Sequence, residues 1–93
     1  MRSKHARIGK HARIHESAEI AADVTVGKHA SLDRDVRVDE GARIDKHVSL
    51  DRGVAVYEDA RIAKQARVDE NAHVGADVRV GKHATIGANA RIG

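Results

Sequence analysis

The chain of 93 residues lacks cysteine, proline, tryptophan and phenylalanine, and Tyr57 is its one tyrosine. The absence of cysteine excludes a disulfide framework and any metal site built from thiolates. The longest apolar run covers residues 54–57, which is far shorter than a membrane span. The first ten residues also lack the apolar stretch of a secretory signal. We therefore expect neither a signal peptide nor a transmembrane segment, which is consistent with cytoplasmic expression.

A strong excess of one charge sign is also absent, because 17 basic and 14 acidic residues give a net charge of +3. The small excess is spread along the chain, which favours solubility and gives little reason to expect a nucleic-acid partner. With 33% charged residues, the composition alone is typical of a disordered chain. The order of the residues indicates a folded one instead.

What the sequence does contain is a repeat of six residues that runs without interruption from His5 to Gly93. Fourteen units are complete and the fifteenth lacks one residue. The fourth position of every unit is Ile, Leu or Val, and the second is Ala in ten units and Val in five. Because an internal repeat of fixed period decides the architecture of a chain, this regularity is the strongest signal in the sequence.

The spacing within each unit predicts a short strand followed by a corner. A helix needs apolar residues at intervals of three and four, which a period of six does not provide. Ala6 and Ile8 instead lie two apart with Arg7 between them, so both point to the same face of a strand. A chain that turns a corner every six residues with its apolar side inward must coil around an axis. The pattern therefore predicts an all-β solenoid.

The six-residue segments "IGKHAR", "VGKHAS", "LDRDVR" and "IGANAR", each of which begins at an aliphatic residue, resemble the hexapeptide repeat of left-handed parallel β-helices. That repeat has an aliphatic residue, then Gly, Ala, Glu or Asp, two free positions, and then Ser, Thr, Ala or Val. The resemblance covers residues 5–93 and implies about five triangular coils of 18 residues. We expect one solenoid domain of fifteen units at 5–93, preceded by an extension at 1–4. The absence of insertions, prolines and caps indicates an idealised or designed member.

Residues 18 positions apart support three units per coil. One such column contains only lysine, and the next contains histidine in four of its five members. The two columns are Lys10, Lys28, Lys46, Lys64 and Lys82, and His11, His29, His47, Gln65 and His83. A period of six alone requires neither column, so the register of 18 is supported independently.

Most histidines stand at the first position of the unit, where the corner ends. The other residues at this position are Asp, Asn, Gly, Ser17 and Gln65. Gly, Asn, Asp and His are enriched at positive φ, so a left-handed corner explains the whole set. The histidines interpreted as turn residues are His5, His11, His29, His47 and His83. His15 and His73 are predicted to be solvated, and Tyr57 to be partly buried without a function.

A metal site is the alternative interpretation of the column with His11, His29 and His47. Stacking on successive coils brings imidazoles close enough to share an ion. The γ-class carbonic anhydrases, which share this fold, hold zinc with histidines between subunits, but the corner column does not reproduce that arrangement. The neighbouring lysines also oppose a cation. We predict no metal site, no cofactor and no catalytic residue.

The hexapeptide acyltransferases share the fold as well and use a histidine as general base, with an extruded loop and a neighbouring subunit. In this chain no unit is interrupted by a loop, and no histidine matches the catalytic one. We therefore predict a structural scaffold that is not an enzyme. The alternative is an oligomeric acyltransferase-like or metal-binding protein.

The lysine column is a candidate surface for an anionic polymer. The outward residues of the adjacent face add Arg7, Arg43, Arg61 and Arg79. There are no aromatics to stack bases, and the next corner is acidic at Asp33, Asp51 and Asp69. These observations favour a solvated corner, and nucleic acid is not an expected partner.

Self-association is the expected partnership, because a solenoid exposes unpaired strand edges at both ends. End-to-end stacking is one form, and the resemblance implies a side-by-side homotrimer as the other. The least bulky face is the candidate trimer contact, and its outward residues are Arg13, Ser31, Ser49, Arg67 and Thr85.

Overall fold

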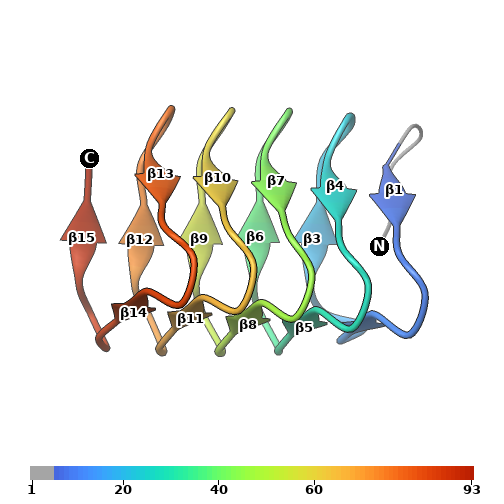
Figure 1. Ribbon diagram of the computed structural model, residues 1–93, viewed down its shortest axis with the longest axis horizontal. Helices are drawn as coiled ribbons and strands as arrows, with labels where there is room; N and C mark the ends of the chain where they lie inside the picture. Colours follow the sequence, from blue (N-terminus) through green and yellow to red (C-terminus); the bar gives the residue numbers. More distant parts are fainter. Residues whose placement is uncertain (1–5) are drawn as a thin grey trace.

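The computed structural model describes residues 6–93 as an all-β solenoid, in which fifteen two-residue strands alternate with turns (Figure 1). Each strand occupies the third and fourth positions of a unit. The predicted extension at residues 1–4 and the predicted turn residue His5 lie outside the described residues. The described part contains no helix, and so none that is long and apolar enough to cross a membrane.

The strands form three parallel sheets of five, and each strand pairs with the strand 18 residues away, as Thr25 does with Arg43. The first sheet contains β1 (Arg7–Ile8), β4 (Thr25–Val26), β7 (Arg43–Ile44), β10 (Arg61–Ile62) and β13 (Arg79–Val80). The second contains β2 (Arg13–Ile14), β5 (Ser31–Leu32), β8 (Ser49–Leu50), β11 (Arg67–Val68) and β14 (Thr85–Ile86). The third contains β3 (Glu19–Ile20), β6 (Arg37–Val38), β9 (Ala55–Val56), β12 (His73–Val74) and β15 (Arg91–Ile92). The predicted solenoid of five 18-residue coils is confirmed.

Backbone hydrogen bonds join each coil to the next at both ends of every short strand. Arg43 N donates to Ala60 O at 2.8 Å, and Asp45 N donates to Ile62 O at 2.9 Å. Since these bonds recur in all three sheets, a residue without an N–H would interrupt the ladder. The absence of proline from the chain agrees with this requirement.

The core consists of the second and fourth positions of the units, as the repeat predicts. Ile44 and Leu50 are each 1% exposed, and Val24 and Ala42 are fully buried. Within residues 6–93 no polar or charged side chain is buried. At the ends of the solenoid the same positions are only half-buried, as at Ile92, because a coil covers them on one side only. Stacked aliphatic side chains therefore stabilise the middle coils most.

The corners are type II turns with a left-handed residue at the first position of the unit. Thirteen of the fourteen first positions in residues 6–93 have φ between 59° and 72°. The turn is closed by a bond between its outer residues, such as the 3.3 Å bond from Ala30 N to Gly27 O around His29. Positive φ at the third turn residue and this closing bond define type II. The histidines at these corners are turn residues, as predicted.

Ser17 is the exception, and the prediction that a left-handed corner explains the whole set is wrong at this unit. Here the amide of Ser17 donates to His15 Nδ1 at 3.0 Å. The Ser17 hydroxyl then accepts the amide of Asp35 at 3.0 Å, whereas His29 N donates to a backbone carbonyl, that of Lys10. The backbone bond that closes the turn is kept, from Ala18 N to His15 O at 2.9 Å, so this corner is a turn of another type with added side-chain bonds, which the identity of Ser17 alone did not reveal.

We expect Gln65→Gly to stabilise the protein by about 0.5–1 kcal/mol, because glycine adopts the φ of +64° found there without a steric penalty. Ser17→Gly, at a corner without positive φ, removes the hydroxyl acceptor of Asp35 N and should cost about 1 kcal/mol. Urea unfolding of both variants measures the two changes. Changes of the same sign in the two variants would contradict this description of the corners.

Candidate functional site

His11, His29 and His47 form a stack of imidazole rings at the corner between the first and second sheets. Neighbouring ring centroids are 5.1 Å apart, and the interplanar angles are 14° and 6°. The stack follows from the parallel register, which places one turn residue above the next. Imidazole nitrogens bind a metal through lone pairs in the ring plane, so parallel rings direct them side by side and not toward one ion.

In residues 6–93 no group of three or more histidine, aspartate or glutamate side chains is placed to hold a metal ion. The prediction that the histidine column carries no metal stays a prediction. The parallel geometry of the rings is its physical support.

The stack lowers the pKa of His29 below its usual value of 6.5. Desolvation is the largest cause, followed by repulsion from His11, His47 and Lys28. A base with a lower pKa in the folded chain than in the unfolded chain binds fewer protons when folded, so stability increases with pH in that range. Protonation of His29 therefore destabilises the folded state. This loss of stability is fully present below the folded pKa of His29 and disappears above about pH 6.5.

We expect His29→Gln to reduce the loss of stability that occurs when the pH falls from about 7.5 to 5. Glutamine is accepted at this column, since Gln65 occupies it with a φ of +64°. His83→Gln is the matched control, because the neighbour of His83 in the column is Gln65. Denaturant unfolding at several pH values measures the effect, and equal pH slopes for His29→Gln and the wild type would contradict it.

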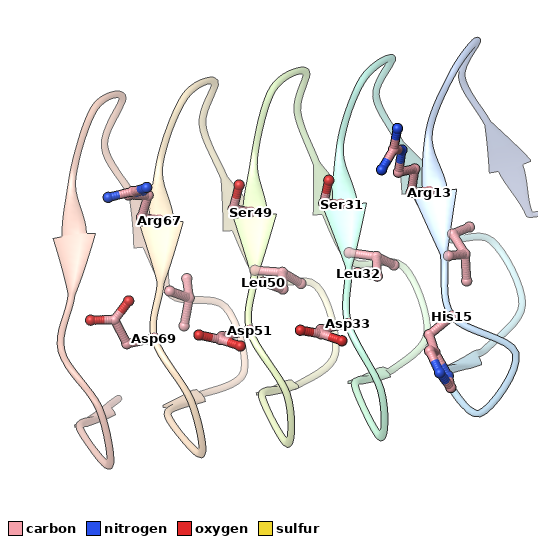
Figure 2. A pocket seen from close by; sticks show the side chains of 12 residues that line it. Arg13, His15, Ser31, Leu32, Asp33, Ser49, Leu50, Asp51, Arg67 and Asp69 are labelled. Atoms are coloured by element: carbon pink, nitrogen blue, oxygen red, sulfur yellow. The ribbon is translucent and has the colours of Figure 1, made fainter.

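A groove of about 540 Å³ crosses the second sheet from β2 to β11 (Figure 2). Figure 2 shows outward serines and arginines along one side and aspartates along the other, with Leu32 and Leu50 between them. The residues labelled along its two sides are Arg13, Ser31, Ser49 and Arg67, and His15, Asp33, Asp51 and Asp69. This is the face predicted to contact a second subunit, and that prediction remains untested.

The aspartates of the groove also shape its backbone. Oδ1 of Asp33 accepts the amide of Arg34 at 2.7 Å, and Oδ1 of Asp51 accepts the amide of Arg52 at 2.8 Å. His15 holds the equivalent position one coil earlier and contacts Ser17 Oγ at 2.9 Å. The prediction that His15 is exposed agrees with the structure, although its ring takes part in the turn.

His73 and Tyr57 form a pair of functional groups that the repeat pattern did not predict. The Tyr57 hydroxyl lies 3.0 Å from His73 Nδ1, and the two rings meet edge to face at 5.9 Å. The prediction that His73 is solvated is wrong, because its side chain is half-buried on β12 beside the buried Ala55 of β9. Tyr57 is 40% exposed, in agreement with its predicted partial burial.

The pair has the chemistry of an oriented general base. In the tautomer whose Nδ1–H donates to the Tyr57 oxygen, Nε2 of His73 keeps its lone pair and can accept a proton from another molecule. A hollow of about 430 Å³ adjoins the pair at the C-terminal end of the third sheet. Its lining includes Tyr57, His73, Gly75 and Arg91. The 18-residue register placed His73 two positions from the column of Tyr57, which is the signal that could have found the pair.

Comparison with known proteins identifies the fold. A family model described as bacterial transferase hexapeptide (six repeats) matches residues 59–93. UDP-N-acetylglucosamine acyltransferase from Francisella novicida superposes with a TM-score of 0.54 at 17% identity, covering 98% of this chain and 62% of that one. A histidine-to-alanine mutant of GDP-perosamine N-acetyltransferase from Caulobacter crescentus, in complex with CoA and GDP-perosamine, gives 0.52 at 20% identity, covering 92% and 51%. No curated protein matches the sequence.

The fold is a hexapeptide-repeat left-handed β-helix. The predicted resemblance is therefore confirmed for the fold. This β-helix spans between half and two thirds of the length of the two acyltransferase structures. The prediction of a designed origin stays a prediction.

The prediction that this β-helix is not an enzyme is contradicted. The matching family model is that of bacterial transferases, and both structures are acyltransferases. The prediction gave too much weight to the missing loop, although a β-helix can also position an imidazole on a strand, as it does at His73.

Proposed function

We propose that this β-helix belongs to an oligomeric acyltransferase in which His73 is the general base. The observation that carries the proposal is the contact of 3.0 Å between His73 and Tyr57 beside a hollow. His73 and Arg91 also lie within residues 59–93, the segment that matches the transferase family. The proposal includes acyl-CoA as donor and a nucleotide-linked sugar as acceptor, and its support is a similar protein in complex with CoA and GDP-perosamine.

The proposed step is attack of an amine or hydroxyl of the acceptor on the carbonyl carbon of the thioester. A C–N or C–O bond forms, the C–S bond breaks, and CoA leaves as the thiol. Nε2 of His73 removes the proton of the nucleophile and returns it to the leaving sulfur. Tyr57 holds the imidazole ring, and the guanidinium of Arg91 supplies positive charge at the hollow for a phosphate group.

A homotrimer is the assembly that we propose, with the face of the second sheet as the contact. The groove on that face mixes arginines with aspartates, so the charges of one subunit have partners on another. Three chains of 10.1 kDa give a particle of about 30 kDa by light scattering. A particle of about 10 kDa at assay concentration would contradict the trimer.

Release of CoA thiol tests the proposed reaction, and the absence of cysteine from the chain removes the background of a thiol reagent. The protein is incubated with acetyl-CoA and an amino-sugar nucleotide. We expect His73→Gln to lower the rate by about 100-fold or more, the usual contribution of a general base. His83→Gln, at an exposed corner outside the hollow and the second-sheet groove, is the control and should keep the rate.

Two outcomes contradict the proposed reaction. Wild-type protein that releases no thiol above the uncatalysed rate would leave a structural scaffold as the function. A His73→Gln variant as active as the wild type would remove His73 from the reaction.

A further inference from the structure

Three arginines lie side by side on neighbouring strands of the first sheet. Arg61 on β10 pairs in register with Arg43 on β7 and with Arg79 on β13. Parallel strands are about 4.8 Å apart, and like charges directly opposite one another destabilise a sheet. All three side chains are exposed to solvent. The arrangement is unfavourable for the isolated protein and favourable once an anion lies across it.

The other two sheets avoid this arrangement. On the second sheet two serines separate Arg13 from Arg67. On the third sheet Arg37 follows Glu19, and their Nε and Oε1 atoms are 3.4 Å apart. Within residues 6–93 the ion pairs below 4.0 Å are this one and that of Arg52 with Glu70, so neither involves the arginines of the first sheet.

A column of five lysines stands at the corner that follows the first sheet. We call these lysines and the outward arginines of the first sheet the basic face. Its members are Arg7, Arg43, Arg61 and Arg79, and Lys10, Lys28, Lys46, Lys64 and Lys82. The positions between the two columns are Gly9, Gly27, Asp45, Ala63 and Gly81, so they add one acid and little bulk.

A groove of about 740 Å³ lies along the basic face and opens between the arginines and the lysine corner, where Lys82 lines it. In the sequence, nearby acidic residues favour a solvated corner as the interpretation of the lysine column. These residues, Asp33, Asp51 and Asp69, line the groove of the second sheet. A whole sheet therefore separates them from the arginines. The remaining acids near the first sheet lie at its opposite corner, for example Asp59 before β10.

We propose that the basic face binds the phosphate backbone of double-stranded nucleic acid without sequence preference. A duplex carries one charge per about 1.7 Å of its axis, so lysines and arginines spaced along one line release many counterions when they bind it. The face offers no aromatic side chain for stacking of unpaired bases, which disfavours a single strand. Contacts to phosphates carry no sequence information. This surface is separate from the His73 hollow and does not depend on the proposed reaction.

Fluorescence anisotropy with a labelled duplex of about 20 base pairs tests the proposal between about 50 and 200 mM NaCl. The triple variant Arg43→Ser, Arg61→Ser, Arg79→Ser removes the three neighbouring arginines of the first sheet. Serine already occurs at the outward positions of β5 and β8. We expect at least tenfold weaker binding and a salt slope smaller by roughly 2–3, since each lost phosphate contact contributes about 0.9.

A second triple variant controls for net charge. Arg34→Ser, Arg37→Ser and Arg52→Ser are at exposed positions outside the first sheet, the second-sheet groove and the His73 hollow, and either triple change lowers the net charge from +3 to zero. The control variant should bind within about threefold of the wild type. Replacing Arg43, Arg61 and Arg79 by lysine should preserve binding, because a phosphate needs only the charge.

Melting curves establish that each variant is folded. If the variant with serine at Arg43, Arg61 and Arg79 does not fold, a second variant replaces it. Lys28→Ser with Lys64→Ser and Lys82→Ser removes charge from the lysine corner and is expected to weaken binding in the same way. The proposal is overturned if the wild type does not bind the duplex, if both triple variants lose affinity equally, or if single-stranded DNA or inorganic polyphosphate binds more tightly than the duplex.

Discussion

Ile44→Asp is expected to abolish cooperative folding at room temperature. Ile44 is 1% exposed on β7 of the middle coil, where it stacks between Val26 and Ile62. A carboxylate there has no partner, because no polar side chain is buried within residues 6–93. An unpaired charge in such a core costs several kcal/mol, which is comparable with the total stability of a small domain, about 5–15 kcal/mol.

Circular dichroism during thermal and urea unfolding measures this effect. Ile44→Ala is the graded form of the same change and should lower the unfolding free energy by about 2–5 kcal/mol. Arg43→Ser, one residue earlier on the exposed side of β7, should have nearly no effect on stability. A cooperative transition of Ile44→Asp near the wild-type melting temperature would show that this side chain is not in the core.

Arg61→Pro is expected to cost on the order of 3 kcal/mol, although Arg61 is exposed and on the surface of the solenoid. Its amide donates to Val78 O at 2.8 Å, and β10 has a paired strand on both sides. Proline removes this donor from the middle of a sheet and fixes φ near −65°, away from the value of a parallel strand. Nothing in the side chain of Arg61 accounts for such a loss.

Lys64→Pro is the matched control three residues later. Lys64 is the second residue of the turn that Ala66 N closes on Ala63 O at 3.4 Å, with Gln65 at a φ of +64°. Proline is favoured at the second position of a type II turn, so the unfolding free energy should stay unchanged or rise by about 0.4–1 kcal/mol. Equal losses in Arg61→Pro and Lys64→Pro would contradict the assignment of strand and turn within the unit.

The coil and its register were predictable from the sequence because they depend on side chains that repeat. An aliphatic residue stands at the fourth position of every six-residue unit, from Ile8 to Ile92, and a coil is the one way to bury them all. The lysine column at 18-residue intervals then sets three units per coil. Ser17 was not predictable in the same way, since its turn depends on a hydrogen bond with the ring of His15.

The candidate site was predictable only in part, because it depends on contacts between columns. The stack of His11, His29 and His47 follows directly from the register. The contact of Tyr57 with His73 joins two different positions of the unit and requires a side-chain direction that the repeat does not specify. The 18-residue spacing of Arg43, Arg61 and Arg79 was visible in the sequence. Their separation from the aspartates in the groove of the second sheet became clear only from the arrangement of the three sheets.

Stacking of residues 18 positions apart is the claim on which the other conclusions depend, and cysteine crosslinking tests it most directly in a chain without cysteine of its own. Ser31 and Ser49 are in-register partners on β5 and β8, and a strand spacing of about 4.8 Å lies within the Cα range of a disulfide. The variant with Ser31→Cys and Ser49→Cys should form an intramolecular disulfide under mild oxidation, detected by mass spectrometry of the monomer. Ser49→Cys with Arg61→Cys, 12 positions apart on different sheets, should not. Crosslinking of the second pair and not of the first would contradict the coil of 18 residues.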